Sequence, residues 1–169
     1  MKVTRWILII AIPIVILFIL FSGTGEKVLT VGEYVPDFRL TDLSGDYFFL
    51  NNYRSKVILL NFSATWCTCC LEELPYLEDL KQKYSKRGLI VASVFKDHNS
   101  INLIRDIKEK NQLTFPVLTD RESGVFNRFG VRALPCTIII DRSSSIRYIH
   151  TGFLFDDLQK YEREISSLL

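Results

Sequence analysis

The chain has room for one ordinary domain plus an appendage, because it has 169 residues and 48% of them are hydrophobic. Its formal net charge is +2, from 21 basic and 19 acidic residues. Lys2 and Arg5 account for this excess, since no acidic residue precedes Glu26. The rest of the chain is neutral and lacks the basic stripe of nucleic-acid-binding proteins, so we expect no nucleic acid among its partners.

Residues 1–25 are predicted to form a transmembrane signal-anchor that places the protein in the lipid bilayer. Residues 6–21 carry no charge, and with residues 22–23 the run approaches the roughly 20 residues that cross a membrane. The two basic residues before it place the N-terminus in the cytoplasm. The alternative is a cleaved signal peptide, whose apolar core is normally about 7–15 residues long. Because this run is longer, we expect an uncleaved anchor.

Residues 26–32 are expected to act as a tether, and residues 33–169 as one domain on the extracytoplasmic side of the cytoplasmic membrane. Apolar runs bounded by turn signals predict strands at 35–40, 47–50, 57–62, 89–95, 116–118, 137–141 and 146–150. Helices are expected after Cys67, from Asn99 or Ser100, around Val125 and from Asp156. This alternation predicts an α/β fold, with an N-terminal hairpin and a mixed sheet covered by helices on both faces.

The stretch Trp66-Cys67-Thr68-Cys69-Cys70 contains a Cys-x-x-Cys motif between a predicted buried strand and a predicted helix. At a helix N-terminus, free backbone N–H groups and the helix dipole favour a thiolate at Cys67. Cys70 lies one turn further on, where side chains are about 5–6 Å apart at Cβ, so the two can alternate between dithiol and disulfide. A structural disulfide or half of a zinc site is the alternative, but the fourth cysteine and the two histidines are scattered. The context favours redox chemistry without a metal or other cofactor.

Several separated motifs occur in a specific order: Asn61–Cys67, Cys67–Cys70, Glu73 with Pro75, Phe115–Leu118, Phe129–Val131, Leu134–Pro135 and Ile140–Asp141. Together they resemble the membrane-anchored, thioredoxin-like proteins of the TlpA/ResA type, in the AhpC/TSA-redoxin superfamily. The resemblance covers about residues 33–169 and implies a thioredoxin-like fold. It also implies a thiol-disulfide oxidoreductase outside the cytoplasmic membrane, working mainly as a reductase. Its implied partners are protein disulfides, with apocytochrome c as one candidate in cytochrome c maturation, and a membrane protein that donates electrons.

The resemblance also implies roles for single residues. Cys67 is the exposed attacking thiolate and Cys70 the resolving thiol. Pro135 forms a cis peptide bond facing the motif, although only about 5–6% of X-Pro bonds are cis. Trp66 and Leu134 are expected to bind substrate, Leu134 at a strand edge that an extended segment could join.

Glu73 is the predicted proton carrier. It follows Cys70 by three residues and lies on roughly the same helix face, whereas Glu72 is turned away by about 100°. A carboxylate near a thiol raises the pKa of that thiol and can act as its base. The resemblance implies the same role, and the amide at Asn61, where thioredoxin has a buried acid, cannot act as a base. The alternative is that Glu73 is a solvated first-turn acid.

Cys69 and Cys136 depart from the family pattern, which often has proline and threonine at these positions. Cys69 is expected on a helix face nearly opposite Cys67, and Cys136 as a small buried residue. Both are then dispensable for disulfide reduction. Otherwise they are accessory thiols that tune the redox potential, or they join Cys67 and Cys70 in a soft-metal site. With such a site, the alternative function is that of a copper-handling protein. A peroxidase is disfavoured, because its Pro-x-x-x-Thr-x-x-Cys signature requires proline where Asn61 stands.

Overall fold

The structure is a computed structural model that describes residues 27–154 and 157–169. Within these residues, seven strands form one mixed sheet in the order β2-β1-β5-β4-β3-β6-β7. The strands are β1 (Arg39–Asp42), β2 (Tyr47–Phe49), β3 (Val57–Ser63), β4 (Leu89–Phe95), β5 (Val117–Thr119), β6 (Cys136–Ile140) and β7 (Ile146–Thr151). The helices are α2 (Thr68–Tyr84), α3 (Ile101–Lys110), α4 (Gly124–Arg128) and α5 (Asp157–Leu168), with short 3-10 turns at Leu50–Tyr53, Ser85–Arg87 and His98–Ser100.

Strand β3 lies between a parallel and an antiparallel neighbour and is buried along its whole length. It pairs in parallel with β4 and antiparallel with β6, and all seven of its residues are buried. A central strand covered on both faces needs apolar side chains on both faces, which explains the continuous run that begins at Val57. The chain therefore passes from a fully buried strand into the segment that carries the Cys-x-x-Cys motif.

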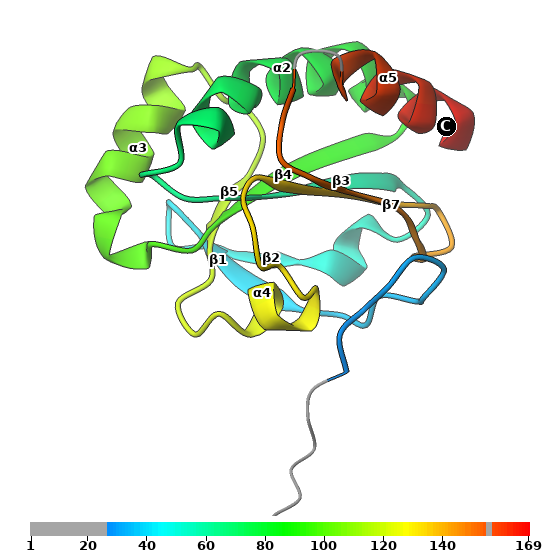
Figure 1. Ribbon diagram of the computed structural model, residues 1–169, viewed down its shortest axis with the longest axis horizontal. Coiled ribbons are helices and arrows are strands. Elements are labelled where there is room, and N and C mark those ends of the chain that lie inside the picture. Colours follow the sequence, from blue (N-terminus) through cyan, green and yellow to red (C-terminus); the bar gives the residue numbers. More distant parts are fainter. Residues whose placement is uncertain (1–26, 155–156) are drawn as a thin grey trace, which may run out of the picture.

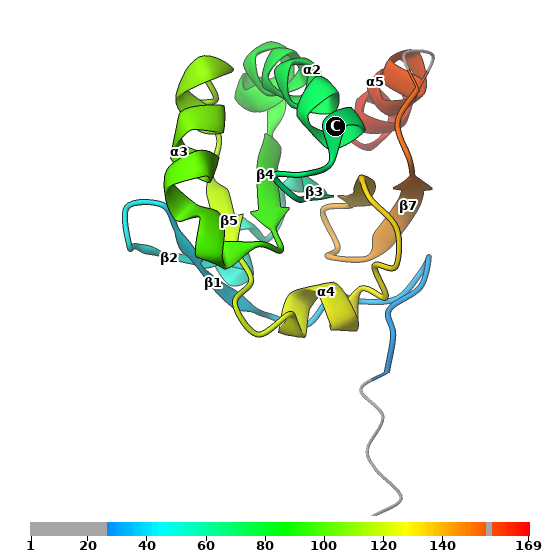
Figure 2. The ribbon, with the colours of Figure 1, turned by 60° about the vertical axis from the view of Figure 1, so that its left-hand side comes forward.

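Helices cover both faces of the sheet, as predicted (Figure 1). Figure 2 shows α2, α3 and α5 on one side and α4 on the other. Leu74 and Leu77 of α2, Ile104 of α3 and Ile165 of α5 pack in one core cluster with alternate residues of the strands. The second cluster contains Phe126 of α4 and the apolar residues of the N-terminal segment. The Cys-x-x-Cys motif belongs to the α2 side.

The N-terminal hairpin is confirmed, with β1 and β2 paired antiparallel and Leu40 opposite Phe48. The strand predicted from residue 35 begins only at Arg39. The backbone N–H of Val35 instead donates to the carbonyl of Ser144, in the turn between β6 and β7, at 2.8 Å. This segment therefore packs across the end of a distant hairpin before it enters the sheet.

The predicted signal-anchor, residues 1–25, lies outside the described residues. Among the helices of the described part, none combines the length and the apolar character needed to span a bilayer.

Candidate active site

Cys67 and Cys70 form a disulfide at the N-terminus of α2, with their Cα atoms 5.2 Å apart. Cys67 is the N-cap of the helix, in an extended conformation, and its Sγ accepts a hydrogen bond from the backbone N–H of Cys70 at 3.3 Å. The same N–H would stabilise a Cys67 thiolate after reduction. Cys67 is 6% exposed and Cys70 is fully buried. In the disulfide form Cys67 is thus more accessible than its partner, but much less exposed than we predicted.

The loop before Cys67 is held by a carboxylate at the end of β4. Asp97 accepts hydrogen bonds from the backbone N–H of Thr65, at 3.1 and 3.0 Å to its two oxygens, and from the Thr65 hydroxyl. The link fixes the segment that carries the chain from β3 into α2. Asp97 was not recognised from the sequence, because 32 residues separate it from Thr65 and only the parallel pairing of β3 with β4 brings the two together.

Glu73 is fully buried, so the alternative of a solvated first-turn acid is wrong. Its Oε2 accepts a hydrogen bond from Asn61 Nδ2 at 2.8 Å, and its Oε1 accepts one from Thr137 Oγ1 at 2.8 Å. Burial is the main reason that the pKa of Glu73 rises to about 7, and the hydrogen bonds only partly oppose this rise. Glu72 is exposed. Glu73 can therefore take up and release a proton near neutral pH.

Sheet register explains why these polar groups meet. Asn61 of β3 is opposite Ser93 of β4 and Thr137 of β6. Its Oδ1 accepts hydrogen bonds from Ser63 Oγ at 2.7 Å and from Ser93 Oγ at 2.8 Å. Its amide is therefore oriented with the Nδ2 donor toward Glu73. From the sequence, Asn61 was interpreted only as a residue that cannot act as a base, and its role as a hydrogen-bond donor was missed.

Tyr161 of α5 helps to enclose Glu73. Burial raises the pKa of the Tyr161 phenol, and the neighbouring Glu73 carboxylate raises it further. Among the described residues, its buried hydroxyl has no hydrogen-bond partner. Nothing in the sequence spacing of Tyr161 indicated that it would approach Glu73.

The bond between Leu134 and Pro135 is cis, as the family resemblance implied. Leu134 packs against the buried cluster of Ala64, Cys67 and Cys70, so this loop lies directly beside the disulfide. Strand β6, which follows, is paired on both sides by β3 and β7. A substrate segment could therefore pair only with residues before Cys136, which restricts the predicted strand edge to the region of Leu134. Trp66 is 71% exposed and available for contact with a substrate.

The two additional cysteines lie in different environments. Cys136 is buried in the cluster on the α4 side, because alternation along β6 turns Thr137 toward Glu73 and Cys136 away from it. Burial raises the pKa of the Cys136 thiol to about 11, so it is a neutral core residue at physiological pH. Cys69 is half-buried, with its Sγ 3.6 Å from the Sγ of Cys67.

The expectation that Cys69 faces away from Cys67 was wrong. It applied helical spacing to both residues, but Cys67 is an extended N-cap and only Cys69 lies within the helix. The three sulfur atoms of Cys67, Cys69 and Cys70 all lie within 4.8 Å of one another. Cys136 is not part of this group, so of the alternative soft-metal site of three or four thiolates, the structure brings together three.

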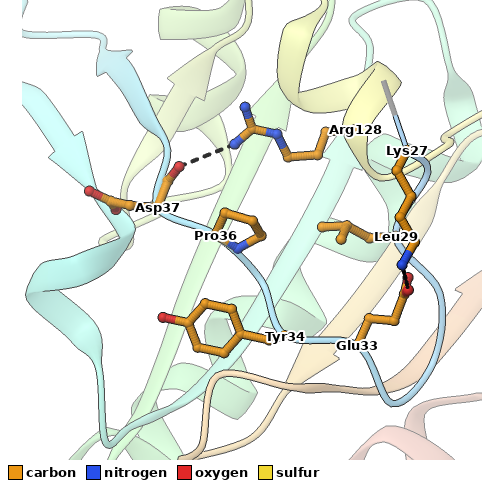
Figure 3. A pocket seen from close by; sticks show the side chains of 7 residues that line it. All are labelled: Lys27, Leu29, Glu33, Tyr34, Pro36, Asp37 and Arg128. Carbon is orange, nitrogen blue, oxygen red and sulfur yellow. Dashed lines mark hydrogen bonds and ion pairs between the residues drawn. The ribbon is translucent and has the colours of Figure 1, made fainter. Parts of the chain in front are cut away.

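A pocket of about 590 Å³ lies between the N-terminal segment and α4. Figure 3 shows its lining, where Lys27 pairs with Glu33 and Arg128 donates to the carbonyl of Asp37 at 3.1 Å. None of the cysteines lines it. This pocket is therefore separate from the Cys67–Cys70 disulfide.

Disulfide exchange requires a thiolate that can be reached, a second thiol that can close a ring with it, and a group that accepts the second thiol's proton. The N-terminus of α2 and Cys70 supply the first two requirements, and the buried carboxyl of Glu73, about one turn after Cys70, is the candidate for the third. Together with the sheet order and the cis-proline loop, they define a thioredoxin-fold thiol-disulfide oxidoreductase.

Comparison with known proteins agrees with this class. The model of the AhpC/TSA family matches residues 31–149, and the chain belongs to this family. It is 36% identical over 143 residues to the thiol-disulfide oxidoreductase ResA of Geobacillus thermodenitrificans, covering 84% of this chain and 82% of that protein. It is 37% identical over 122 residues to the thioredoxin-like protein YneN of Bacillus subtilis, covering 72% and 71%. A solved structure from Chlorobium tepidum, assigned as the thiol:disulfide interchange protein DsbE, superposes with a TM-score of 0.77 at 26% identity, over 83% of this chain and 98% of that one.

Proposed function

We propose that the protein is a membrane-tethered reductase of protein disulfides on the extracytoplasmic side of the cytoplasmic membrane. The observation that carries this proposal is the Cys67–Cys70 pair at the N-terminus of α2, packed beside the cis-proline loop and followed by a buried acid. The uncharged run before residue 22 and the basic residues preceding it support the tether and its orientation.

In the proposed reaction, the Cys67 thiolate attacks one sulfur of a substrate disulfide. A mixed disulfide forms and one substrate thiolate leaves. Glu73 takes the proton from Cys70, whose thiolate then attacks the Cys67 sulfur. This closes the Cys67–Cys70 disulfide, and the second substrate thiolate leaves and is protonated. Two electrons have passed from the enzyme to the substrate, so a membrane protein must reduce the enzyme again.

A substrate-trapping experiment tests this function. Cys70→Ser removes the resolving thiol, so a substrate disulfide attacked by Cys67 should remain bound as a mixed disulfide that reducing agents release. Cys67→Ser, which lacks the attacking thiol, is the matched control and should trap nothing. If both variants trap equally, or neither traps any protein that contains a disulfide, the proposed reductase reaction is wrong.

We further propose apocytochrome c as a substrate, as the family resemblance of the sequence motifs implies. A peptide with an oxidised Cys-x-x-Cys-His haem-attachment motif should be reduced faster than a peptide of equal length with widely spaced cysteines. Equal rates would leave a general reductase and remove the reason to place it in cytochrome c maturation.

A further inference from the structure

We propose that the reduced protein binds one Cu(I) ion through the thiolates of Cys67, Cys69 and Cys70, and that the loaded form cannot exchange disulfides. The inference adds a ligand to the proposed reductase site and uses Cys69, which the reductase reaction does not need. Its starting point is the position of the Cys69 sulfur, 3.6 Å from the sulfur of Cys67.

The spacing of the three sulfur atoms suits a common metal ion. Thiolates that bind one metal at about 2.3 Å in a trigonal arrangement lie about 4 Å from one another. The Cys67–Cys69 separation of 3.6 Å is close to this value, and Cys69 and Cys70 lie within the 4.8 Å limit of the group. Reduction of the disulfide needs only to separate the sulfur atoms of Cys67 and Cys70, which their 5.2 Å Cα spacing permits.

The ligand set selects the metal. Among the described residues, no histidine, aspartate, glutamate or fourth cysteine joins the group. Structural zinc sites almost always have four ligands, whereas soft thiolates favour Cu(I). Cys67 and Cys70 are buried while Cys69 is half-buried, so the ion would enter past Cys69 and be shielded from solvent on its other sides.

Binding is a coordination step, not a redox step. The three thiols lose their protons to solvent and copper remains Cu(I). The N–H of Cys70 and the helix N-terminus already favour negative charge on the Cys67 sulfur. Because the ion occupies the attacking and the resolving sulfur together, metal binding and disulfide exchange exclude each other.

The test is a titration of the full chain, reduced and then freed of reductant under anaerobic conditions, with Cu(I) in competition with a chromophoric chelator. We expect one Cu(I) per chain, three sulfur atoms in its X-ray absorption spectrum, and at least about tenfold weaker binding by Cys69→Ser. Cys136→Ser is the matched control and should bind like the parent. The oxidised chain should not bind, since two of its sulfur atoms are joined. Equal affinity of Cys69→Ser and the parent, or a metal bound by only two sulfur atoms, would overturn the proposal.

A second measurement separates this inference from the proposed function. Cu(I) should abolish disulfide exchange by the parent, and the chelator should restore it; exchange that continues in the loaded protein contradicts the mutual exclusion. The titration contains no disulfide substrate. If the trapping experiment fails but Cu(I) still binds in a Cys69-dependent way, the reductase reaction is rejected and the metal site is supported. If trapping succeeds but binding does not depend on Cys69, the metal site is rejected and the reductase reaction is supported.

Discussion

The carboxyl group of Glu73 is enclosed by hydrogen-bond donors that carry no charge. Asn61 and Thr137 donate to it, while the charge of Asp157 opposes its ionisation. Neutral donors stabilise a carboxylate less than a cation does, so the cost of burial dominates and the pKa is raised to about 7. A group with this pKa exists in both protonation states near neutral pH, which is what a carrier of the Cys70 proton requires.

The first prediction concerns the rate of exchange. Glu73→Gln should slow disulfide exchange at pH 7 by at least about tenfold, because general acid–base groups typically contribute 10² to 10⁴. It should also remove the part of the pH dependence of the rate around pH 7 that comes from ionisation of Glu73. Stopped-flow measurement of exchange against pH tests this, with Glu72→Gln as the control. If the two variants behave alike, Glu73 is not the proton carrier.

The second prediction concerns folding stability. Below about pH 4.5 the Glu73 carboxyl is protonated in both the folded and the unfolded chain, so it adds no dependence on pH. Between pH 4.5 and about 7 only the unfolded chain ionises, and the free energy of unfolding falls as pH rises. At about 1.4 kcal/mol per unit, the loss is about 3 kcal/mol above pH 7.

Urea denaturation of the oxidised protein at several pH values measures this loss. The stability of Glu73→Gln relative to the parent should increase by about 3 kcal/mol between pH 4 and pH 8, since glutamine does not ionise. Glu72→Gln should follow the parent at every pH. A constant difference between Glu73→Gln and the parent would show that the pKa of Glu73 is not raised.

Among the secondary-structure elements, the start of α2 was predicted in part: the positions of its residues were predictable from the sequence, but the conformation of Cys67 was not. The apolar run of β3, the Cys-x-x-Cys motif and the helical spacing after it were enough to place Cys67 at a helix N-terminus and Glu73 on the face of Cys70. The extended conformation of Cys67 was not predictable from that spacing, and it brings the Cys69 sulfur beside the Cys67 sulfur. Thr137 and Asp97 were missed because their contacts depend on strand pairings that the sequence does not specify.

The third prediction concerns the connection between β4 and this turn. Asp97→Ala removes the acceptor for the N–H and the hydroxyl of Thr65, and should cost about 1.5–3 kcal/mol of folding stability, the range for hydrogen bonds to charged groups. It should also slow disulfide exchange, because the segment that positions Cys67 loses its anchor. Denaturation and exchange measurements test both effects.

Two control variants accompany this test. Asp97→Asn, which keeps one acceptor, should recover part of the lost stability and part of the lost exchange rate. Asp106→Ala, at an exposed position of α3, should change stability by less than about 0.5 kcal/mol. An Asp97→Ala protein that is as stable and as active as the parent would show that the contact does not hold the loop.

At the scale of the whole molecule, strand and helix alternation predicted the mixed sheet and its two covered faces. The order of the strands was not predicted, because neither periodicity nor composition determines which strands pair. The segment around Val35 shows why long-range contacts were not predicted. Its apolar residues are typical of a strand, but its backbone N–H donates a hydrogen bond to the turn after β6. Such a contact brings together residues more than 100 positions apart and leaves no local signal.

The last prediction concerns the proposed attachment of this domain to the membrane. It is based on the sequence before residue 26. An uncharged run of this length is expected to partition into a bilayer, and Lys2 with Arg5 before it is expected to keep the N-terminus in the cytoplasm. In a bacterial host, the full chain should sediment with membranes, and protease added to spheroplasts should digest the domain that carries Cys67. A reporter fused to the N-terminus should remain protected. The matched control replaces both basic residues by glutamate, which should reduce the fraction of chains in this orientation. If the domain is instead released in soluble form with a new N-terminus after the apolar run, the segment is a cleaved signal peptide and the proposed tether is wrong.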